Sequence, residues 1–255
     1  MMRLSALVVA HNEAAQLAAC LATLRFADEI VVVLDRTTAR SPAIAEEYGA
    51  RIVEGSWHLE GDRRSAGIEA CHGEWILEVD ADERVPPELA EEIKHRLPTA
   101  QRGYFLIPFA NHIGHRLVRW GWGAYNGVSM KPCLFAKGCK LWGRQRVHPK
   151  LELSGHRYAM TQAMTHYVYR DVADAVQRLN RYSSLNAEQM REDGTIGTLW
   201  PNLRRMLSRF WKSYVARRGY REGLYGLLLG LFSALYPILS YLKARLAEDG
   251  KEPIR

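Results

Sequence analysis

Three carboxylates crowd the end of one apolar segment. Residues 75–79 are rich in large and branched side chains, which predicts a buried strand, and Asp80, Asp82 and Glu83 follow at once. Like charges this close repel, and they are costly to bury unless a cation lies between them. Carboxylate oxygens suit Mg²⁺ or Mn²⁺, and Mg²⁺ favours one or two carboxylates together with substrate phosphates. We therefore expect Asp80 and Asp82 to hold a divalent metal ion and a diphosphate. The alternative is a solvated acidic turn before the next helix.

Apolar and helical segments alternate through the first third of the chain. Strands are expected at residues 4–10, 30–34, 51–54 and 75–79. Helices are expected at residues 12–25, 41–48, 62–71 and 86–97. This alternation predicts βαβ units, and therefore an α/β fold with a mostly parallel, Rossmann-like sheet covered by helices on both faces.

Polar side chains follow the expected strands. Asn12 and Glu13 come after the first strand, Asp35 after the second, and the Asp80/Asp82 pair after the fourth. Ligands bind outside the carboxyl ends of the strands in such sheets, so this rule gathers the five side chains on one edge. The chain has no GxGxxG loop after the first strand and no GxxxxGK[ST] sequence, which argues against a dinucleotide-binding domain and a P-loop enzyme.

Two arginines precede the fourth strand. Arg63 and Arg64 lie on the expected helix at residues 62–71 and could supply positive charge to a phosphate. The alternative is that they belong to a solvated helix face.

Aromatic residues and glycines are concentrated in residues 111–143. Trp120 and Trp122 flank Gly121, and exposed aromatic rings suit the faces of sugars, so both are candidate contacts for an acceptor. The alternative is a loop-rich β extension that packs its own aromatic side chains. Residues 134–135 and 141–142, on either side of a short turn, predict a β-hairpin.

The excess of positive charge lies in one segment. The net charge is +7, and residues 200–221 contain seven basic residues and no acidic one. Residues 201–218 predict a helix with an apolar stripe flanked by arginine and lysine, which is typical of a helix in an anionic membrane interface. The alternative is a basic helix packed on the core.

The next segment, residues 223–242, contains no charged residue. Roughly 20 apolar residues can cross a bilayer. Gly226, Gly230 and Pro237 weaken its hydrophobic character, so we favour a kinked helix or helical hairpin in the interface over a true span. The four cysteines have no CxxC spacing and predict reduced thiols without a disulfide or zinc site, and no signal peptide is expected at the start of the sequence.

Several segments together resemble a known family, the family 2 glycosyltransferases, and in particular the subgroup similar to lipopolysaccharide-core β-1,4-glucosyltransferases. The segments are LSALVVAHNE (4–13), ADEIVVVLD (27–35), AEEYGA (45–50), GEWILEVDADERV (73–85) and RGYREG (218–223). The resemblance covers most of the chain. It implies a GT-A fold, a UDP-sugar donor and an inverting transfer.

The resemblance also implies roles for individual residues. Asn12, Glu13 and Asp35, with Ala10 beside them, would line the pocket for the nucleobase and ribose. Arg63, Arg64 and Asp80 would complete the donor site. Asp80 and Asp82 match the family's DxD acids, with Asp82 more directly on the metal, and His166 matches a histidine that could approach the diphosphate or the metal.

The chain departs from the subgroup at two places. The subgroup usually has Val-His-Glu where this chain has Val147-His148-Pro149, and a glutamate there would be an attractive general base. The candidate bases that are left are His148 and Glu152. Arg36 and its neighbours replace the small residues that are usual after Asp35.

These observations predict a metal-dependent enzyme of two parts. Residues 1–165 would form the GT-A catalytic domain, and residues 166–255 a helical region for association with membrane and acceptor. The enzyme would transfer a sugar, with glucose favoured, from a UDP-sugar to a membrane-associated acceptor such as lipopolysaccharide core. It would lie at the cytoplasmic face of the bacterial inner membrane, peripheral or partly embedded.

Three alternatives remain at this point. They are a polyprenyl-phosphate glycosyltransferase, a nucleotidyltransferase on a similar sheet, and a non-catalytic, membrane-bound binder of sugar nucleotides. Nucleic acid is not expected as a partner, because the apolar stripe beside the basic residues fits a membrane better.

Overall fold

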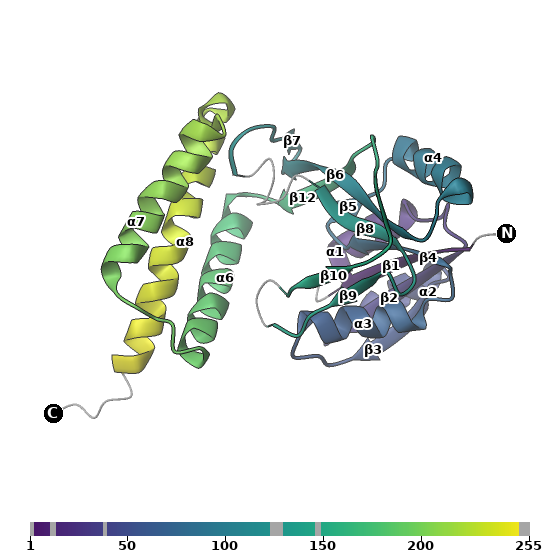
Figure 1. Ribbon diagram of the computed structural model, residues 1–255, viewed down its shortest axis with the longest axis horizontal. Helices are drawn as coiled ribbons and strands as arrows, with labels where there is room; N and C mark the ends of the chain where they lie inside the picture. Colours follow the sequence, from purple (N-terminus) through teal and green to yellow (C-terminus); the bar gives the residue numbers. More distant parts are fainter. Residues whose placement is uncertain (1–2, 11–13, 38–39, 123–129, 146–148, 250–255) are drawn as a thin grey trace. The chain divides into compact units, whose positions relative to one another are not determined.

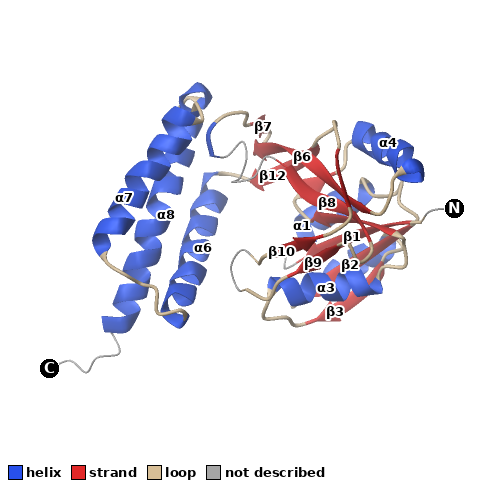
Figure 2. Ribbon diagram, in the orientation of Figure 1, coloured by secondary structure: helices blue, strands red, loops and turns tan. Residues whose placement is uncertain are grey.

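The computed structural model describes residues 3–10, 14–37, 40–122, 130–145 and 149–249, which fold as two compact units (Figure 1). The first unit comprises Met1–Ala110 and Ser129–His166, and the second comprises Asn111–Val128 and Tyr167–Arg255. The second unit contains the three long helices, whereas most strands belong to the first (Figure 2).

Four parallel strands form one half of the sheet in the first unit. Their order is β3 (Arg51–Gly55), β2 (Glu29–Asp35), β1 (Leu4–Ala10) and β4 (Trp75–Asp80). Val8 lies opposite Val32 on β2 and Val79 on β4, so β1 is the central strand of this half. Because all four strands run the same way, their carboxyl ends lie along one edge, as the sequence predicts.

The other half of the sheet is mainly antiparallel. It continues from β4 through β8 (Met130–Ala136), β6 (Gly103–Ile113) and β12 (Met164–Tyr169) to β5 (Glu83–Arg84). The short strands β7 (Arg116–Leu117) and β11 (His156–Ala159) pair with β6. The sheet is therefore mixed, because the segments after residue 97 return without a helical crossover.

The predicted hairpin over residues 134–142 is wrong in its pairing. A tight turn at Gly138, whose φ is +89°, does join β8 to β9 (Lys140–Trp142). However, β8 pairs with β4 and β6, while β9 pairs with β10 (Leu151–Leu153) in a separate two-stranded sheet. The physical reason is burial, since Leu134 and Phe135 gain a fully apolar neighbour in β4.

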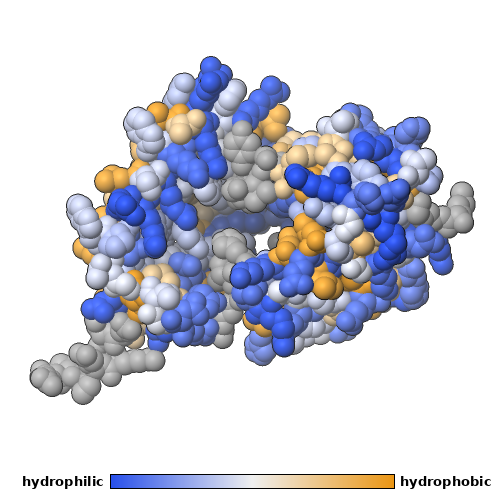
Figure 3. Space-filling model, viewed as in Figure 1, coloured by the Kyte–Doolittle hydropathy of each residue, from blue (hydrophilic) through white to orange (hydrophobic). Residues whose placement is uncertain are grey.

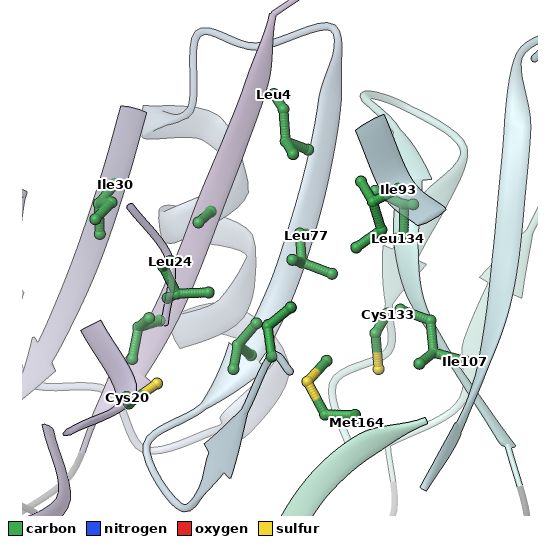
Figure 4. Packing of buried hydrophobic residues seen from close by; sticks show 14 of the residues in the cluster. Leu4, Cys20, Leu24, Ile30, Leu77, Ile93, Ile107, Cys133, Leu134 and Met164 are labelled. Atoms are coloured by element: carbon green, nitrogen blue, oxygen red, sulfur yellow. The ribbon is translucent and has the colours of Figure 1, made fainter. Parts of the chain in front are cut away.

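Helices cover both faces of the sheet. Leu4, Ala6 and Val8 face a cluster that includes side chains of α1 (Ala14–Ala22), α2 (Arg40–Glu47) and α4 (Pro87–Arg96). Leu7 and Val9 face the opposite cluster, which packs against α3 (Glu60–Ala70). Figure 4 shows part of the larger cluster, in which Leu77 lies between Leu4 and Cys133. The alternation along β1 follows from the two-residue period of a strand.

The second unit contains three long helices. They are α6 (Val172–Glu192), α7 (Leu199–Phe210) and α8 (Leu224–Asp249). The helix predicted at residues 201–218 ends at Phe210 and continues as one wider turn, η2 (Trp211–Ala216), followed by the short helix η3 (Gly219–Glu222). Helix α8 passes through Pro237 without ending, so residues 224–249 form one helix and not a hairpin.

Small residues bring α6 and α8 together. Ala187 and Ala244 are buried in one cluster, and Lys243 donates hydrogen bonds to Ser183 and Ser184. Val172, Val176, Tyr182 and Leu185 of α6 are exposed, whereas Met190 packs against the cluster of Ala187 and Ala244. Four large apolar side chains of this helix therefore lie outside its packed face.

One helix in the described part of the chain, Leu224–Ala247, is long and apolar enough to cross a membrane. Only 39% of its apolar window is buried in the structure, whereas the core helix of a soluble protein is mostly buried.

The contact between α8 and η3 gives a test of this packing. A Cβ at Gly226 would lie 1.8 Å from the backbone oxygen of Gly219, whereas a Cβ at Gly230 would lie 3.3 Å from the Phe210 ring. We expect Gly226→Ala to lower the free energy of unfolding by about 1–3 kcal/mol, because the backbone must shift. Gly230→Ala is the matched control, since it adds helix propensity without that clash. Equal urea midpoints for the two variants would contradict the packing.

Candidate active site

The three carboxylates at the end of β4 are brought together by a turn and a neighbouring strand. Asp80 is the last residue of β4, Asp82 lies in the turn, and Glu83 begins β5. Strand β12 pairs antiparallel with β5 and places His166 opposite Glu83. Met164, His166 and Val168 are the buried residues of β12, so the imidazole faces inward because of the strand's alternation.

Asp82, Glu83 and His166 form a compact group that could hold a metal ion. One ligand atom from each lies within 4.8 Å of the other two, and all three residues are buried. The His166 Nε2 lies 3.7 Å from the Asp82 Oδ1, and the Phe109 ring meets the imidazole edge-on at 5.8 Å. Two carboxylates and an imidazole are donors that a divalent cation accepts.

A lysine offsets part of this negative charge. Lys131 donates a hydrogen bond to Glu83 at 2.9 Å and lies 4.2 Å from the centre of the Phe109 ring. The other Glu83 oxygen accepts from the Asp80 backbone N–H. Burial raises the pKa of Glu83, and the charges of Asp80 and Asp82 add to this while Lys131 opposes it. Lys131 thus neutralises part of the negative charge of the group.

Asp80 is held by a second, buried network. The Arg64 guanidinium donates to Asp80 at 2.8 Å and to Glu78 at 2.7 Å, and Lys140 donates to the other Glu78 oxygen. Burial opposes the ionisation of Asp80, but Arg64 and Lys131 outweigh it and hold the pKa of Asp80 well below its usual range. Burial likewise opposes ionisation of Glu78, and Lys140 and Arg64 hold its pKa below the ordinary value.

Asp35, at the end of β2, has its own set of donors. Arg36 and Arg63 contact its carboxylate at 3.0 Å and 3.2 Å, and the Trp57 backbone N–H donates to it at 3.2 Å. Burial opposes ionisation, but Arg36 and the Trp57 N–H outweigh it, so the pKa of Asp35 lies below its ordinary value. Neither Arg63 nor Arg64 belongs to a solvated helix face, because both donate to carboxylates at strand ends.

The other residues that the sequence predicts for the site differ in burial and in the unit to which they belong. Ala10 is buried at the carboxyl end of β1, and Glu152 is exposed on β10. Trp120 and Trp122 belong to the second unit, where both are half-buried. Asn12, Glu13 and His148 lie outside the described residues. The structure thus brings Asp82 and His166 together, and it adds Glu83 to them. The roles predicted for these residues stay predictions.

Sequence reasoning missed Glu78, Lys131 and Lys140, and it gave no role to Glu83, although it noted that residue beside Asp80 and Asp82. These four side chains complete the charged network around Asp80 and Asp82. Glu78 had a usable signal, because a carboxylate in the middle of an apolar strand needs a buried cation. Lys131 and Lys140 had none, since they come from strands distant in the sequence.

This arrangement defines the class of protein. A parallel half-sheet that ends in clustered carboxylates, extended by antiparallel strands, is a GT-A-like α/β fold. Residues 1–349 of S. aureus TarS have this fold with a TM-score of 0.51 and 14% identity, covering 99% of this chain and 93% of that one. The likeness shows the fold alone.

The family follows from the sequence comparison. Residues 5–124 match the model of glycosyl transferase family 2, so the predicted resemblance to this family is confirmed. An uncharacterized glycosyltransferase of Rickettsia felis is 25% identical, over 96% of this chain and 90% of its own length. The lipopolysaccharide core biosynthesis glycosyltransferase LpsC of Rhizobium meliloti is 24% identical, over 94% of this chain and 91% of its own length.

The buried network gives a direct stability test. Glu78→Gln leaves Arg64 and Lys140 buried with one charge fewer to neutralise them, and we expect it to lower the free energy of unfolding by about 3–5 kcal/mol. Glu60→Gln is the matched control, because Glu60 contacts the same guanidinium but is 37% exposed, and its loss should cost less than about 1 kcal/mol. Urea denaturation of both variants measures the free energy of unfolding. Equal decreases in the two variants would show that Glu78 stabilises the fold no more than Glu60 does.

Proposed function

We propose that this protein transfers a sugar, with glucose the first candidate, from a UDP-sugar to a membrane-associated acceptor such as lipopolysaccharide core, with inversion at the sugar. The observation that carries the proposal is the Asp82–Glu83–His166 group at the end of β4 in a family 2 domain. The similarity to LpsC supports the class of acceptor. Residues 1–165 would bind the donor, and residues 166–255 would serve association with membrane and acceptor.

The residues present fit a divalent cation. Asp82 and Glu83 would bind Mg²⁺ or Mn²⁺ through oxygen, and His166 would add a nitrogen ligand. Such an ion would neutralise charge on the departing diphosphate. Arg64 keeps the Asp80 carboxylate oriented and ionised at the same edge, and Arg63 does the same for Asp35 in the proposed nucleoside pocket.

The acceptor hydroxyl needs a group that takes its proton. General bases typically contribute about 10²–10⁴-fold to a rate. We propose His148 or Glu152 for this role, because Pro149 stands where the resembling subgroup has a glutamate. The same substitution favours a second candidate acceptor, a polyprenyl phosphate, which is already anionic and needs no base. A comparison of the two acceptors with one donor separates these alternatives.

The helical unit supports attachment to an anionic bilayer, which we place at the inner face of the inner membrane. Helix α7 and the adjoining turn expose Trp200, Leu207 and Trp211, and Arg204 and Arg205 are exposed on the same helix. Figure 3 shows hydrophobic and hydrophilic side chains intermingled on the drawn face of this unit. Apolar side chains inserted among cationic ones suit the interface of an anionic membrane.

Asp82→Asn tests the metal role. The change removes a charge but keeps the side chain's size, and we expect UDP release from UDP-glucose with Mn²⁺ to fall by about 10²–10³-fold, because the diphosphate loses electrostatic stabilisation. Asp62→Asn is the matched control, since Asp62 pairs only with the exposed Arg144 among the described residues. Full turnover in Asp82→Asn would refute the metal role. Wild-type binding of UDP-sugar without any turnover would favour the non-catalytic alternative.

Leu207→Ser tests the membrane role. Leu207 is 67% exposed on α7, so its replacement should leave the fold intact. We expect binding to vesicles that contain phosphatidylglycerol to weaken by about tenfold, the value of one inserted leucine. Leu141→Ser is the control, because Leu141 is 58% exposed on β9 of the first unit. Co-sedimentation measures both, and equal binding by the two variants would argue against insertion of α7.

A further inference from the structure

Two tryptophans of the second unit are each contacted by two arginines. The Arg221 and Arg218 guanidinium carbons lie 4.7 Å and 5.7 Å from the centre of the Trp120 ring. Those of Arg217 and Arg209 lie 4.5 Å and 5.8 Å from the centre of the Trp122 ring. We call these six residues the Trp–Arg cluster. Contact with a ring face stabilises a guanidinium without neutralising its charge.

The cluster has little negative charge to balance it. Among the described residues, no carboxylate lies within 4 Å of the guanidinium groups of Arg209, Arg218 or Arg221. Glu222 is the only acidic residue between positions 199 and 247. Its buried carboxylate accepts from the backbone N–H groups of Arg119 and Trp120 and from the Arg116 side chain. The Glu222 carboxylate is therefore already hydrogen-bonded to donors outside the four cluster arginines.

Hydrogen bonds from four consecutive N–H groups hold the backbone that carries the two tryptophans. The N–H groups of Arg119 and Trp120 donate to the Glu222 carboxylate. The Gly121 N–H donates to the Arg217 carbonyl at 2.9 Å. The Trp122 N–H donates to the Ser213 hydroxyl at 3.1 Å. Four consecutive donors are thus satisfied by η2, η3 and the turn between them. The indole rings and the arginines that follow Ser213 are held as one pre-organised group.

Two features of the Trp–Arg cluster reduce the stability of the fold. Arg218 adopts φ of +56°, a left-handed conformation that an arginine rarely takes. Burial lowers the pKa of Arg209, with the charge of Arg205 adding to it and Tyr236 opposing it. Clustered like charges and a strained residue lower stability, and such features concentrate where a ligand uses them.

We propose that the Trp–Arg cluster binds a phosphate group on the acceptor saccharide. The identification of this saccharide as the acceptor rests on the proposed function, whereas phosphate binding itself does not. Guanidinium groups bind phosphate oxygens through paired N–H donors. Arg209 and Arg217 are half-buried, so water screens their charges less and their attraction for a phosphate is stronger. The exposed Arg218 and Arg221 leave the phosphate accessible from solvent.

The charges of the cluster fit phosphate better than a neutral sugar. A neutral sugar ring that stacked on an indole face in contact with a guanidinium group would have to displace that group, which loses the cation–π contact. A phosphate adds to these contacts without breaking them. The Trp–Arg cluster is cationic, so it needs no metal ion to hold an anion. The acidic group of the first unit could hold a diphosphate only through a bound cation.

The test is binding of a soluble phosphosugar by the full chain. Glucose 6-phosphate is titrated in detergent and EDTA and followed by its ³¹P resonance, so that no metal-bound complex at the acidic site contributes. We expect Arg218→Gln and Arg221→Gln each to weaken binding by about tenfold, the value of one hydrogen-bonded charge pair. Glucose, followed by its proton signals, should not bind.

A matched control comes from the same unit. Arg181 is exposed and lies 5.1 Å from the centre of the Tyr182 ring, so Arg181→Gln removes the same charge and the same kind of contact outside the cluster. It should bind glucose 6-phosphate like the wild type. Unchanged binding by Arg218→Gln and Arg221→Gln, or an equal loss in Arg181→Gln, would overturn the proposal.

Two further arms identify the source of the phosphate. If Arg218→Gln and Arg221→Gln weaken binding to phosphatidylglycerol vesicles but not to glucose 6-phosphate, the ligand is a lipid headgroup and the proposal is wrong. If both variants lose glucose 6-phosphate while the wild type turns over no UDP-sugar, the phosphate site stands and the transferase proposal fails. The two ideas can therefore be rejected separately.

Discussion

The neutralisation of carboxylates at the end of β4 is the constraint on which the first unit depends. Asp80 ends a strand that is buried on both faces, Asp82 follows it, and buried charge is tolerated only when it is paired. The chain supplies Arg64 from a helix on one face and Lys131 from an antiparallel strand. These cations pair with Asp80 and Glu83, and Asp82, Glu83 and His166 lie together where a cation could bind.

The second unit has the opposite imbalance. Its basic residues outnumber its acids most strongly in α7 and the turns that follow, and the single acid there, Glu222, organises the backbone. Exposed Trp200 and Leu207 lie on the same helix as the outward basic side chains. Acidic side chains are thus clustered in the first unit and arginines in the second.

The sequence predicted the part of the site that is local in the chain. The strands that end at Ala10, Asp35 and Asp80 were found from apolar runs, and the parallel order followed from the helices between them. It failed where neighbours come from distant segments. The hairpin at residues 134–142 was mispaired, because the choice between β4 and β9 as partner depends on which edge is buried.

The sequence by itself thus determined the α/β class, the resemblance to family 2 glycosyltransferases and the acidic strand ends, since each rests on short-range periodicity or on residues within a few positions of each other. Only the tertiary structure decided that Glu83 and His166 join Asp82, that Arg64 holds Asp80, and that four arginines contact two tryptophans. The reason is physical. The energy of a charge or a ring depends on what lies within a few ångströms of it, and that neighbourhood exists only after distant strands and helices have packed.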